Sequence, residues 1–244
     1  MGMLKMQAGK CATSVSDAES RADLIHTEVP ASRRVRSRWL SSAFRMLVDA
    51  CLLDDPKWYA PLAEALAPRP GERILDCGPG SALRALYCAD RFPDSQFVAV
   101  EFNRRRITKA FKRASSMNLS NYKAMTFEDA RRTPFGAGSF DKALLVLNLH
   151  GLAPEDKTKN LRELRRILRR GGIVLAADID QPKASREDVI LRLTQLFYGA
   201  EATKSHTSGT WPKYLTEAGF TGVRRLSEHP IWIGRMALIR SRKQ

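Results

Sequence analysis

The sequence lacks long apolar runs, paired cysteines and an N-terminal leader pattern. No uninterrupted apolar segment of the 244 residues approaches the ~20 residues that a helix needs to cross a bilayer. The four cysteines show none of the close spacings typical of zinc or redox sites, so we expect no metal centre. No apolar stretch near the N-terminus resembles a signal peptide. These absences favour a cytoplasmic protein that is soluble or at most peripheral to a membrane.

Acidic residues are scarce relative to basic ones, with 26 against 41 and a net charge of +15. Such an excess favours nucleic acid or an anionic membrane as a partner. However, many of the cations fall in expected helices that would cover the flanks of a sheet, which favours solvated helix faces. A peripheral membrane contact that delivers a lipophilic substrate remains an alternative. The basic clusters are Arg33–Arg38, Arg104–Arg113 and Arg162–Arg170.

The segment Arg73–Ala82 predicts a buried strand that runs into a tight glycine turn and then a helix. Gly78 and Gly80 would let backbone amides approach a nucleotide-like ligand closely. Asp76 stands two residues before the first glycine, and a second acid, Glu101, ends the next apolar run. This combination predicts a cofactor site.

The two acids indicate which cofactor the turn would hold. The dinucleotide fingerprint has a third glycine where this chain has Leu83, and Asp76 would repel a pyrophosphate. S-adenosylmethionine has no phosphate and carries an ammonium and a sulfonium, so a carboxylate at the turn complements it. Glu101 can accept hydrogen bonds from both ribose hydroxyls. The pattern therefore predicts S-adenosylmethionine as the cofactor.

At these motifs the sequence resembles the class I S-adenosylmethionine-dependent methyltransferases. The narrower resemblance is to the small-molecule group that includes the ubiquinone and menaquinone C-methyltransferases. It implies that Asp129 and Ala130 bind the adenine, that Phe102 or Phe127 faces the ring, and that Asn148 lies near the methionine end. The matching segments, which span roughly residues 70 to 180, are Leu75–Gly80, Val98–Glu101, Phe127–Ala130 with Pro134–Phe135, Ser139–Asp141 and Leu164–Gly172.

Strand and helix signals alternate through most of the chain, which predicts an α/β fold. We expect a Rossmann-like, doubly wound, mostly parallel seven-stranded sheet with an antiparallel C-terminal hairpin. The last two strands are separated by too few residues for a helical crossover, so they should pair antiparallel. The expected strands are 73–77, 96–101, 122–126, 141–147, 172–178, 222–228 and 231–241. The expected helices are 81–91, 103–116, 156–169, 184–199 and 211–219.

The chain is expected to form one domain with additions, because α/β folds of this size usually have a single core. Residues 1–28 are polar and without periodicity, and we expect a disordered arm there. Residues 29–244 would form the methyltransferase domain. Its expected parts are leading helices (29–69), the cofactor-binding core (70–180), an acceptor-side insert (181–210), and a C-terminal helix with the hairpin (211–244).

The candidate catalytic residue is His150, in the loop after the fourth strand. Methyl transfer relies mainly on alignment and desolvation, and it requires a base only where the acceptor must lose a proton. His150 can serve as that base, or it can simply hydrogen-bond a backbone group. The acceptor-side candidates are Asp178 and Asp180, which could instead cap a helix or a turn, together with Tyr198 and His206.

Three functional classes remain open from the residues alone. The first is methyl transfer to a small molecule, with an O, N, C or S acceptor atom. The second, a nucleic-acid (RNA) methyltransferase, is suggested only by charge. The chain has neither an Asn-Pro-Pro-aromatic tetrapeptide nor a Pro-Cys pair. The third is a relative that binds S-adenosylmethionine without methylating.

Overall fold

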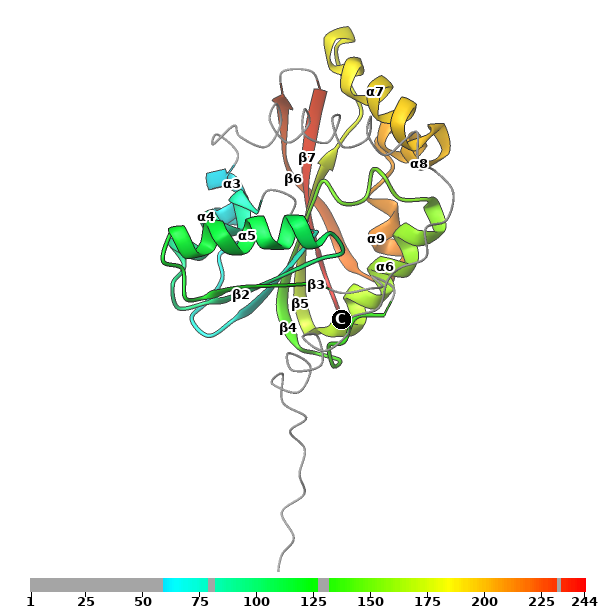
Figure 1. Cartoon of the computed structure of the whole chain (residues 1–244). Coiled ribbons are helices and arrows are strands. Elements are labelled where there is room, and N and C mark those ends of the chain that lie inside the picture. Colours follow the sequence, from blue (N-terminus) through cyan, green and yellow to red (C-terminus); the bar gives the residue numbers. More distant parts are fainter. Residues whose placement is uncertain (1–58, 79–81, 127–131, 232–233) are drawn as a thin grey trace, which may run out of the picture. The chain divides into compact units, whose positions relative to one another are not determined.

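The computed structural model describes residues 59–78, 82–126, 132–231 and 234–244 (Figure 1). The expected arm at 1–28 and the leading-helix region up to residue 58 lie outside these residues. The leading region that is described contains helix α3 (Tyr59–Leu66), which buries Tyr59, Leu62 and Leu66. The division of the chain into parts therefore stays a prediction.

A seven-stranded sheet with the order β3-β2-β1-β4-β5-β7-β6 organises the described residues. The first five strands are parallel, and β7 runs antiparallel to both β5 and β6. This confirms the expected fold class. The strands are β1 (Arg73–Cys77), β2 (Gln96–Glu101), β3 (Tyr122–Thr126), β4 (Phe140–Val146), β5 (Leu168–Ile179), β6 (Thr221–Ile231) and β7 (Gly234–Arg242).

Strand order reverses between β1 and β4, which places a ligand crevice at the carboxyl ends of these strands. The chain proceeds outward from β1 to β2 and β3, then returns to the other side of β1 as β4 and β5. At such a reversal the connecting loops leave in opposite directions and open a gap between them. The glycine turn after β1 and the loop after β4 border this gap.

Helices cover both faces of the sheet, and a separate apolar cluster lies between the sheet and the helices on each face. Alternate strand residues face opposite sides, as Ile74 and Leu75 show by packing into different clusters. Helices α3, α4 (Leu83–Arg91) and α5 (Arg104–Ser116) pack in one cluster. Helices α6 (Pro154–Ile167) and α9 (Lys213–Glu217) pack in the other.

The region after β5 differs from the single expected helix at 184–199. A short 3-10 turn, η2 (Ser185–Glu187), precedes α7 (Asp188–Tyr198), and a separate α8 (Ala200–Thr207) follows. Gly199 has φ +88°, a conformation that L residues rarely adopt, and it breaks the helix between α7 and α8. The apolar spacing predicted a helix that ends at 199, as α7 does, but it predicted neither the 3-10 turn at its start nor α8.

Two different sets of contacts attach this insert to the rest of the fold. Before α7, Glu187 forms a bidentate salt bridge with Arg235 of β7. Nη2 of the arginine lies 2.9 Å from Oε1 of the glutamate, and Nε lies 3.0 Å from Oε2. In α8, the Ser205 hydroxyl accepts from Nζ of Lys157 on α6 at 3.3 Å. The turn that precedes α7 and the helix α8 that follows Gly199 are therefore anchored through different residues.

Candidate functional site

The predicted site residues that the structure describes gather at the carboxyl ends of four adjacent strands. Asp76 lies near the end of β1, Glu101 ends β2, Asn148 follows β4, and Asp178 lies near the end of β5. Because parallel strands end at the same sheet edge, residues up to 102 positions apart in sequence meet there. Gly80, Asp129 and Ala130 lie outside the described residues.

The turn after β1 needs glycine at position 78 for two reasons. Its φ is +64°, and a Cβ atom would lie 2.7 Å from Nδ2 of Asn148. Asn148 in turn donates from Nδ2 to the carbonyl of Cys77 at 3.3 Å, while the Gly78 N–H donates to the carbonyl of Val100 at 2.8 Å. The turn is thus tied to β2 and to the loop after β4.

Asp76 is a buried carboxylate whose Oδ2 has no hydrogen-bond partner among the described residues. Burial raises the pKa of this carboxyl to about 7, an effect that Arg84 opposes and Glu101 reinforces. A small cavity lies against it, lined also by Gly78, Ala82 and Arg84. Ala82, in a left-handed conformation at φ +62°, begins α4 without a side-chain cap. A cationic hydrogen-bond donor in the cavity would satisfy the carboxylate.

Glu101 presents a second carboxylate at the end of β2, and the residues that follow hold it in place. Its Oε1 accepts from the Asn103 N–H at 3.2 Å, and its Oε2 lies 3.5 Å from Nη1 of Arg106. The side chain of Phe102, the residue after it, is 51% exposed. The end of β2 therefore combines a fixed acceptor with an exposed aromatic ring.

Asp178, near the end of β5, is in the opposite situation because both of its oxygens accept hydrogen bonds. Oδ1 accepts from Nδ1 of His150 at 2.8 Å and from the Ile179 N–H at 2.8 Å. Oδ2 accepts from the Leu149 N–H at 2.8 Å and from the His150 N–H at 3.3 Å. Burial alone would raise the pKa of Asp178, but the two nearby histidines, His150 and His206, and these donors lower it below its ordinary value.

The His150 imidazole is held on several sides. Nδ1 faces Asp178, so the neutral ring donates from Nδ1 and keeps Nε2 as its basic nitrogen. Tyr198 meets the ring edge-on at a centroid distance of 5.4 Å. Gly151 makes room for that tyrosine, because a Cβ there would lie 2.7 Å from its ring. The ring is therefore fixed in orientation at the crevice.

His206 lies behind this pair and is fully buried. Its ring stacks on Trp211 at 5.6 Å with an interplanar angle of 3°, and its Nε2 lies 3.9 Å from Oδ2 of Asp178. Burial lowers its pKa to about 3, although Asp178 acts in the other direction. The imidazole is consequently neutral at physiological pH.

Asp180, the other predicted acidic residue of β5, is engaged by the protein itself. Its Oδ1 accepts from Nε1 of Trp211 at 3.0 Å, and its Oδ2 pairs with Arg225 of β6. The backbone N–H of Asp180 also donates to the carbonyl of Arg235 at 2.9 Å. These contacts join the end of β5 to the hairpin.

Two charged residues near the site were not predicted from the sequence. Arg84 lines the cavity beside Asp76, and Lys157 is a fully buried lysine whose ammonium lies 5.2 Å from the ring centroid of Tyr214. Burial lowers the pKa of Lys157 to about 8. Helical spacing did contain a signal for it, because Lys157 precedes buried Leu161 and Leu164 by four and seven positions.

The described residues include no group of three or more His, Cys, Asp or Glu side chains that could hold a metal ion. Likewise, none of the described helices combines the length and the apolar character that a membrane span requires. The described cysteines, Cys77 and Cys88, are free thiols, and burial raises the pKa of both.

Comparison with known proteins identifies relatives of the region that contains this crevice. Residues 74–172 match the family described as methyltransferase domain. Demethylmenaquinone methyltransferase of Beutenbergia cavernae is 30% identical over 128 residues, covering 52% of this chain and 49% of the relative. The ubiquinone/menaquinone biosynthesis C-methyltransferase UbiE of Paracoccus denitrificans is 27% identical over 124 residues, covering 51% and 49%. The chain thus spans about half the length of these curated relatives.

Solved structures share the fold at low sequence identity. The YcgJ protein from Bacillus subtilis superposes with a TM-score of 0.63 at 16% identity, covering 76% of this chain and 97% of that one. A SAM-dependent methyltransferase from Aquifex aeolicus superposes with a TM-score of 0.59 at 14% identity, covering 82% and 96%. The chain therefore shares its fold with these two solved structures.

Proposed function

We propose that the chain is a class I S-adenosylmethionine-dependent methyltransferase that methylates a small molecule, a proposal supported by its fold and by the family that residues 74–172 match. The observation that carries the proposal is the buried carboxylate of Asp76, whose Oδ2 has no partner among the described residues. A buried ionised carboxylate is unfavourable unless it is paired. The ammonium group of S-adenosylmethionine is a suitable partner.

The remaining cofactor contacts follow from the same crevice. Glu101 would accept from the ribose hydroxyls, and Gly78 and Gly80 would let the turn approach the ligand. Asn148, fixed by the Cys77 carbonyl, would face the methionine end. Phe102, Asp129 and Ala130 are assigned to the adenine. When bound, the cofactor supplies a methyl group already activated by the neighbouring sulfonium.

We assign His150 as the general base and Asp178 as the residue that positions it. The Nδ1 to Oδ1 contact of 2.8 Å fixes the tautomer, which leaves Nε2 to take a proton from an acceptor hydroxyl or from an acidic carbon. Tyr198 restricts the ring and borders the acceptor side. Asp180 and His206 would act indirectly, because both contact Trp211. Asp180 accepts a hydrogen bond from its indole N–H, His206 stacks on its ring, and together they would hold it at the floor of the pocket.

The names of the relatives suggest the kind of acceptor to test first. Two of them are named for menaquinone or ubiquinone synthesis, so we propose a lipophilic ring compound with an ionisable hydroxyl. Such an acceptor partitions into membranes, which favours a peripheral membrane contact. A nucleic-acid acceptor, which only the net charge suggested, is not favoured. The free thiols of Cys77 and Cys88 fit a reducing cytoplasm.

Calorimetric titration of the purified protein with S-adenosylmethionine and with S-adenosylhomocysteine tests the cofactor assignment. We expect both to bind, and we expect NAD, whose pyrophosphate Asp76 would repel, not to bind. Failure of both nucleosides to bind the folded protein would remove the basis of the proposal.

The assignment of the base is tested separately with demethylmenaquinone as the acceptor. His150→Ala should lower turnover by about 10²- to 10⁴-fold while the affinity for S-adenosylmethionine stays unchanged. The matched control is His229→Ala, which removes a histidine of β6 that contacts Ser227. Equal turnover in the two variants would exclude His150 as the base.

A further inference from the structure

Helix α5 has an unusually small buried face and a strongly basic composition. Of its 13 residues, Ala110 and Ala114 are the buried ones, and both are small. Six of the residues are basic and none is acidic. A helix that only covered a sheet would be expected to carry larger apolar residues inward and mixed charges outward. The proposed methyl transfer uses only Arg106 of this helix, through its contact with Glu101.

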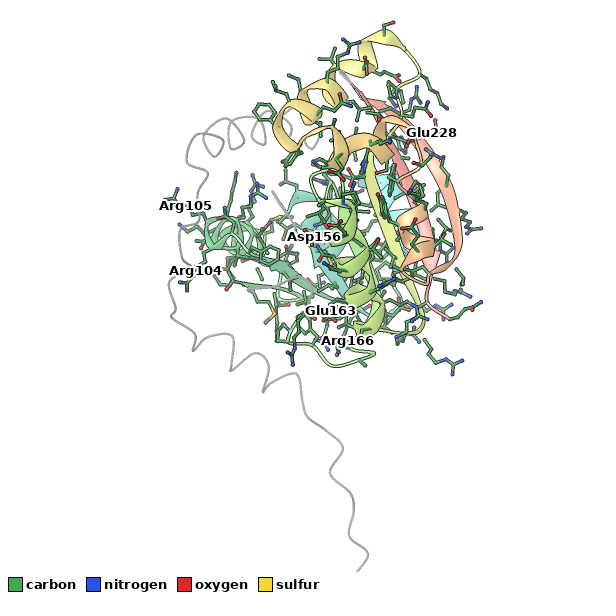
Figure 2. All side chains as sticks on the ribbon, turned by 90° about the vertical axis from the view of Figure 1, so that its right-hand side faces the viewer. Arg104, Arg105, Asp156, Glu163, Arg166 and Glu228 are labelled. Carbon is green, nitrogen blue, oxygen red and sulfur yellow. The ribbon has the colours of Figure 1, made fainter. Side chains whose placement is uncertain are left out.

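The cations of α5 form a continuous stripe on its exposed side. Residues 105, 109, 112 and 113 recur at helical spacing and, with Thr108 and Ser116, line one shallow surface depression. Arg104, Arg105, Lys109 and Lys112 are exposed, and among the described residues no carboxylate lies within ion-pair distance of them. Figure 2 shows Arg104 and Arg105 pointing outward from the first turn of the helix.

Large apolar side chains accompany this stripe. Phe111 is 59% exposed and Met117, just after the helix, is 42% exposed. Exposed aromatic and thioether side chains beside a set of cations are typical of helices that lie in the interface of a membrane.

We propose that α5, with Met117 at its C-terminal end, docks on a bilayer surface that contains anionic lipids. The cations provide the charge complementarity, because each is attracted to the negative surface potential of such a bilayer. Phe111 and Met117 would enter the boundary between headgroups and acyl chains. A nucleic acid would account for the cations but would leave these apolar side chains without a role. The docking does not depend on the proposed reaction, but it would bring the rim of the crevice to the phase where a lipophilic acceptor dissolves.

Sedimentation with vesicles tests the proposal, using vesicles of phosphatidylcholine alone and vesicles that also contain phosphatidylglycerol. We expect the full chain to bind only the anionic vesicles, and the double variant Lys109→Glu/Lys112→Glu to bind them at least ~10-fold more weakly. The control is Lys159→Glu/Arg162→Glu, which makes the same charge change at exposed positions of α6. This control should change vesicle binding less than about 2-fold. Equal losses in the two double variants, or no binding of the parent chain, would overturn the proposal.

Two further measurements separate an interfacial helix from a nucleic-acid surface. Phe111→Ser should weaken vesicle binding about 3- to 10-fold, whereas Leu196→Ser, at an even more exposed apolar position of α7, should not change it. If Lys109→Glu/Lys112→Glu reduces affinity for duplex RNA but not for vesicles, the surface binds nucleic acid and the membrane proposal is wrong. The affinity for S-adenosylmethionine, measured on the same samples, should be unchanged and reports on the cofactor site independently.

Discussion

Asp76 and Asp178 occupy similar places in the sheet but differ in how the protein treats their charge. Both are nearly inaccessible, at 4% and 1% exposure, and both lie near the carboxyl end of a parallel strand. Burial raises the pKa of Asp76, whereas the surrounding donors hold that of Asp178 below its usual range. A carboxylate left without donors is suited to a ligand, and one saturated by donors is suited to holding other residues in place.

The contrast also separates stability from function. Asp178 stabilises the fold because removing it would leave several buried donors without an acceptor. Asp76 destabilises the fold near neutral pH because its ionised form is desolvated and incompletely compensated. Destabilised groups of this kind are retained where activity requires them. Variants of the two aspartates should therefore affect stability in opposite directions.

The largest expected effect is on stability at Asp178. Asp178→Ala should lower the free energy of unfolding by about 3–5 kcal/mol, because it leaves the Leu149 and Ile179 amides and the His150 ring without their acceptor. Urea denaturation followed by circular dichroism measures the change. Asp178→Asn keeps one acceptor and should lose less. A loss below about 1 kcal/mol for the alanine variant would contradict the structural role.

The second prediction concerns Asp76→Asn, which should weaken S-adenosylmethionine binding by about 100-fold or more because it removes the charge opposite the ammonium.

The same variant, Asp76→Asn, should also be more stable than the parent chain above pH 7. The raised pKa of about 7 means that protonated Asp76 favours the folded state at low pH, and that this contribution is lost as pH rises toward 7.

Thermal denaturation of Asp76→Asn and of the parent chain across this pH range measures the difference in stability between them. The variant should gain stability relative to the parent between about pH 4 and pH 7, by on the order of 1–3 kcal/mol, and the difference should stay constant above pH 7. A constant difference at all pH values would mean that the Asp76 pKa is not raised. For the parent chain, cofactor affinity should fall as pH drops below 7, because the carboxyl becomes neutral.

A smaller loss of cofactor affinity is expected at Glu101, whose carboxylate has more hydrogen-bond partners than that of Asp76 and fewer than that of Asp178. Its oxygens already contact Asn103 and Arg106, yet the carboxylate ends a strand at the crevice. Glu101→Gln keeps an acceptor for one ribose hydroxyl and should reduce S-adenosylmethionine affinity about 10-fold with little change in stability. Calorimetric titration measures this. Unchanged affinity would show that the ribose lies elsewhere.

The smallest expected effect concerns the glycine turn after β1, where Gly78 packs against Asn148 of the loop after β4. Gly78→Ala should destabilise the protein by about 1–2 kcal/mol, since it combines a positive φ with a clash against Asn148. Gly71→Ala is the matched control, because its φ of +79° is similar but nothing lies within 4 Å of the added Cβ. The excess loss at Gly78 isolates the contact with Asn148. Equal losses in thermal denaturation would mean that Asn148 moves aside freely.

The sequence predicted the strands that carry the cofactor candidates more accurately than the contacts around His150, while the assignment of the site residues stays a prediction. Asp76, Gly78 and Glu101 sit in short motifs whose strands have strong apolar signals, and strands 73–77, 96–101 and 122–126 match the structure residue for residue. The pairing of His150 with Asp178 joins residues 28 positions apart across neighbouring strands, and no local pattern encodes it. The sequence proposed both residues but could not predict that one fixes the other.

A buried charge and the unpredicted helix α8 were the other differences from the expectations. Lys157 lies on the apolar side of α6 because a carbonyl, a hydroxyl and an aromatic ring can stabilise its ammonium, and those groups come from α8 and α9. The expected helix ends at 199, where α7 also ends, but helix α8 beyond it was not predicted. The position of α8 depends on how it packs on α6, which is tertiary information.

The break at Gly199 has a consequence for how this scaffold can acquire new specificities. Helix α8 is fastened to α6 through Lys157, while η2 is held by the Glu187–Arg235 pair. Between these two attachments, Val189 and Leu196 of α7 are exposed, at 44% and 78%. Exchanging such exposed positions, while Glu187, buried Leu191 and Tyr198 are kept, would change the outer surface of the insert without disturbing the carboxylates of the sheet, which gives this scaffold a route to new specificities.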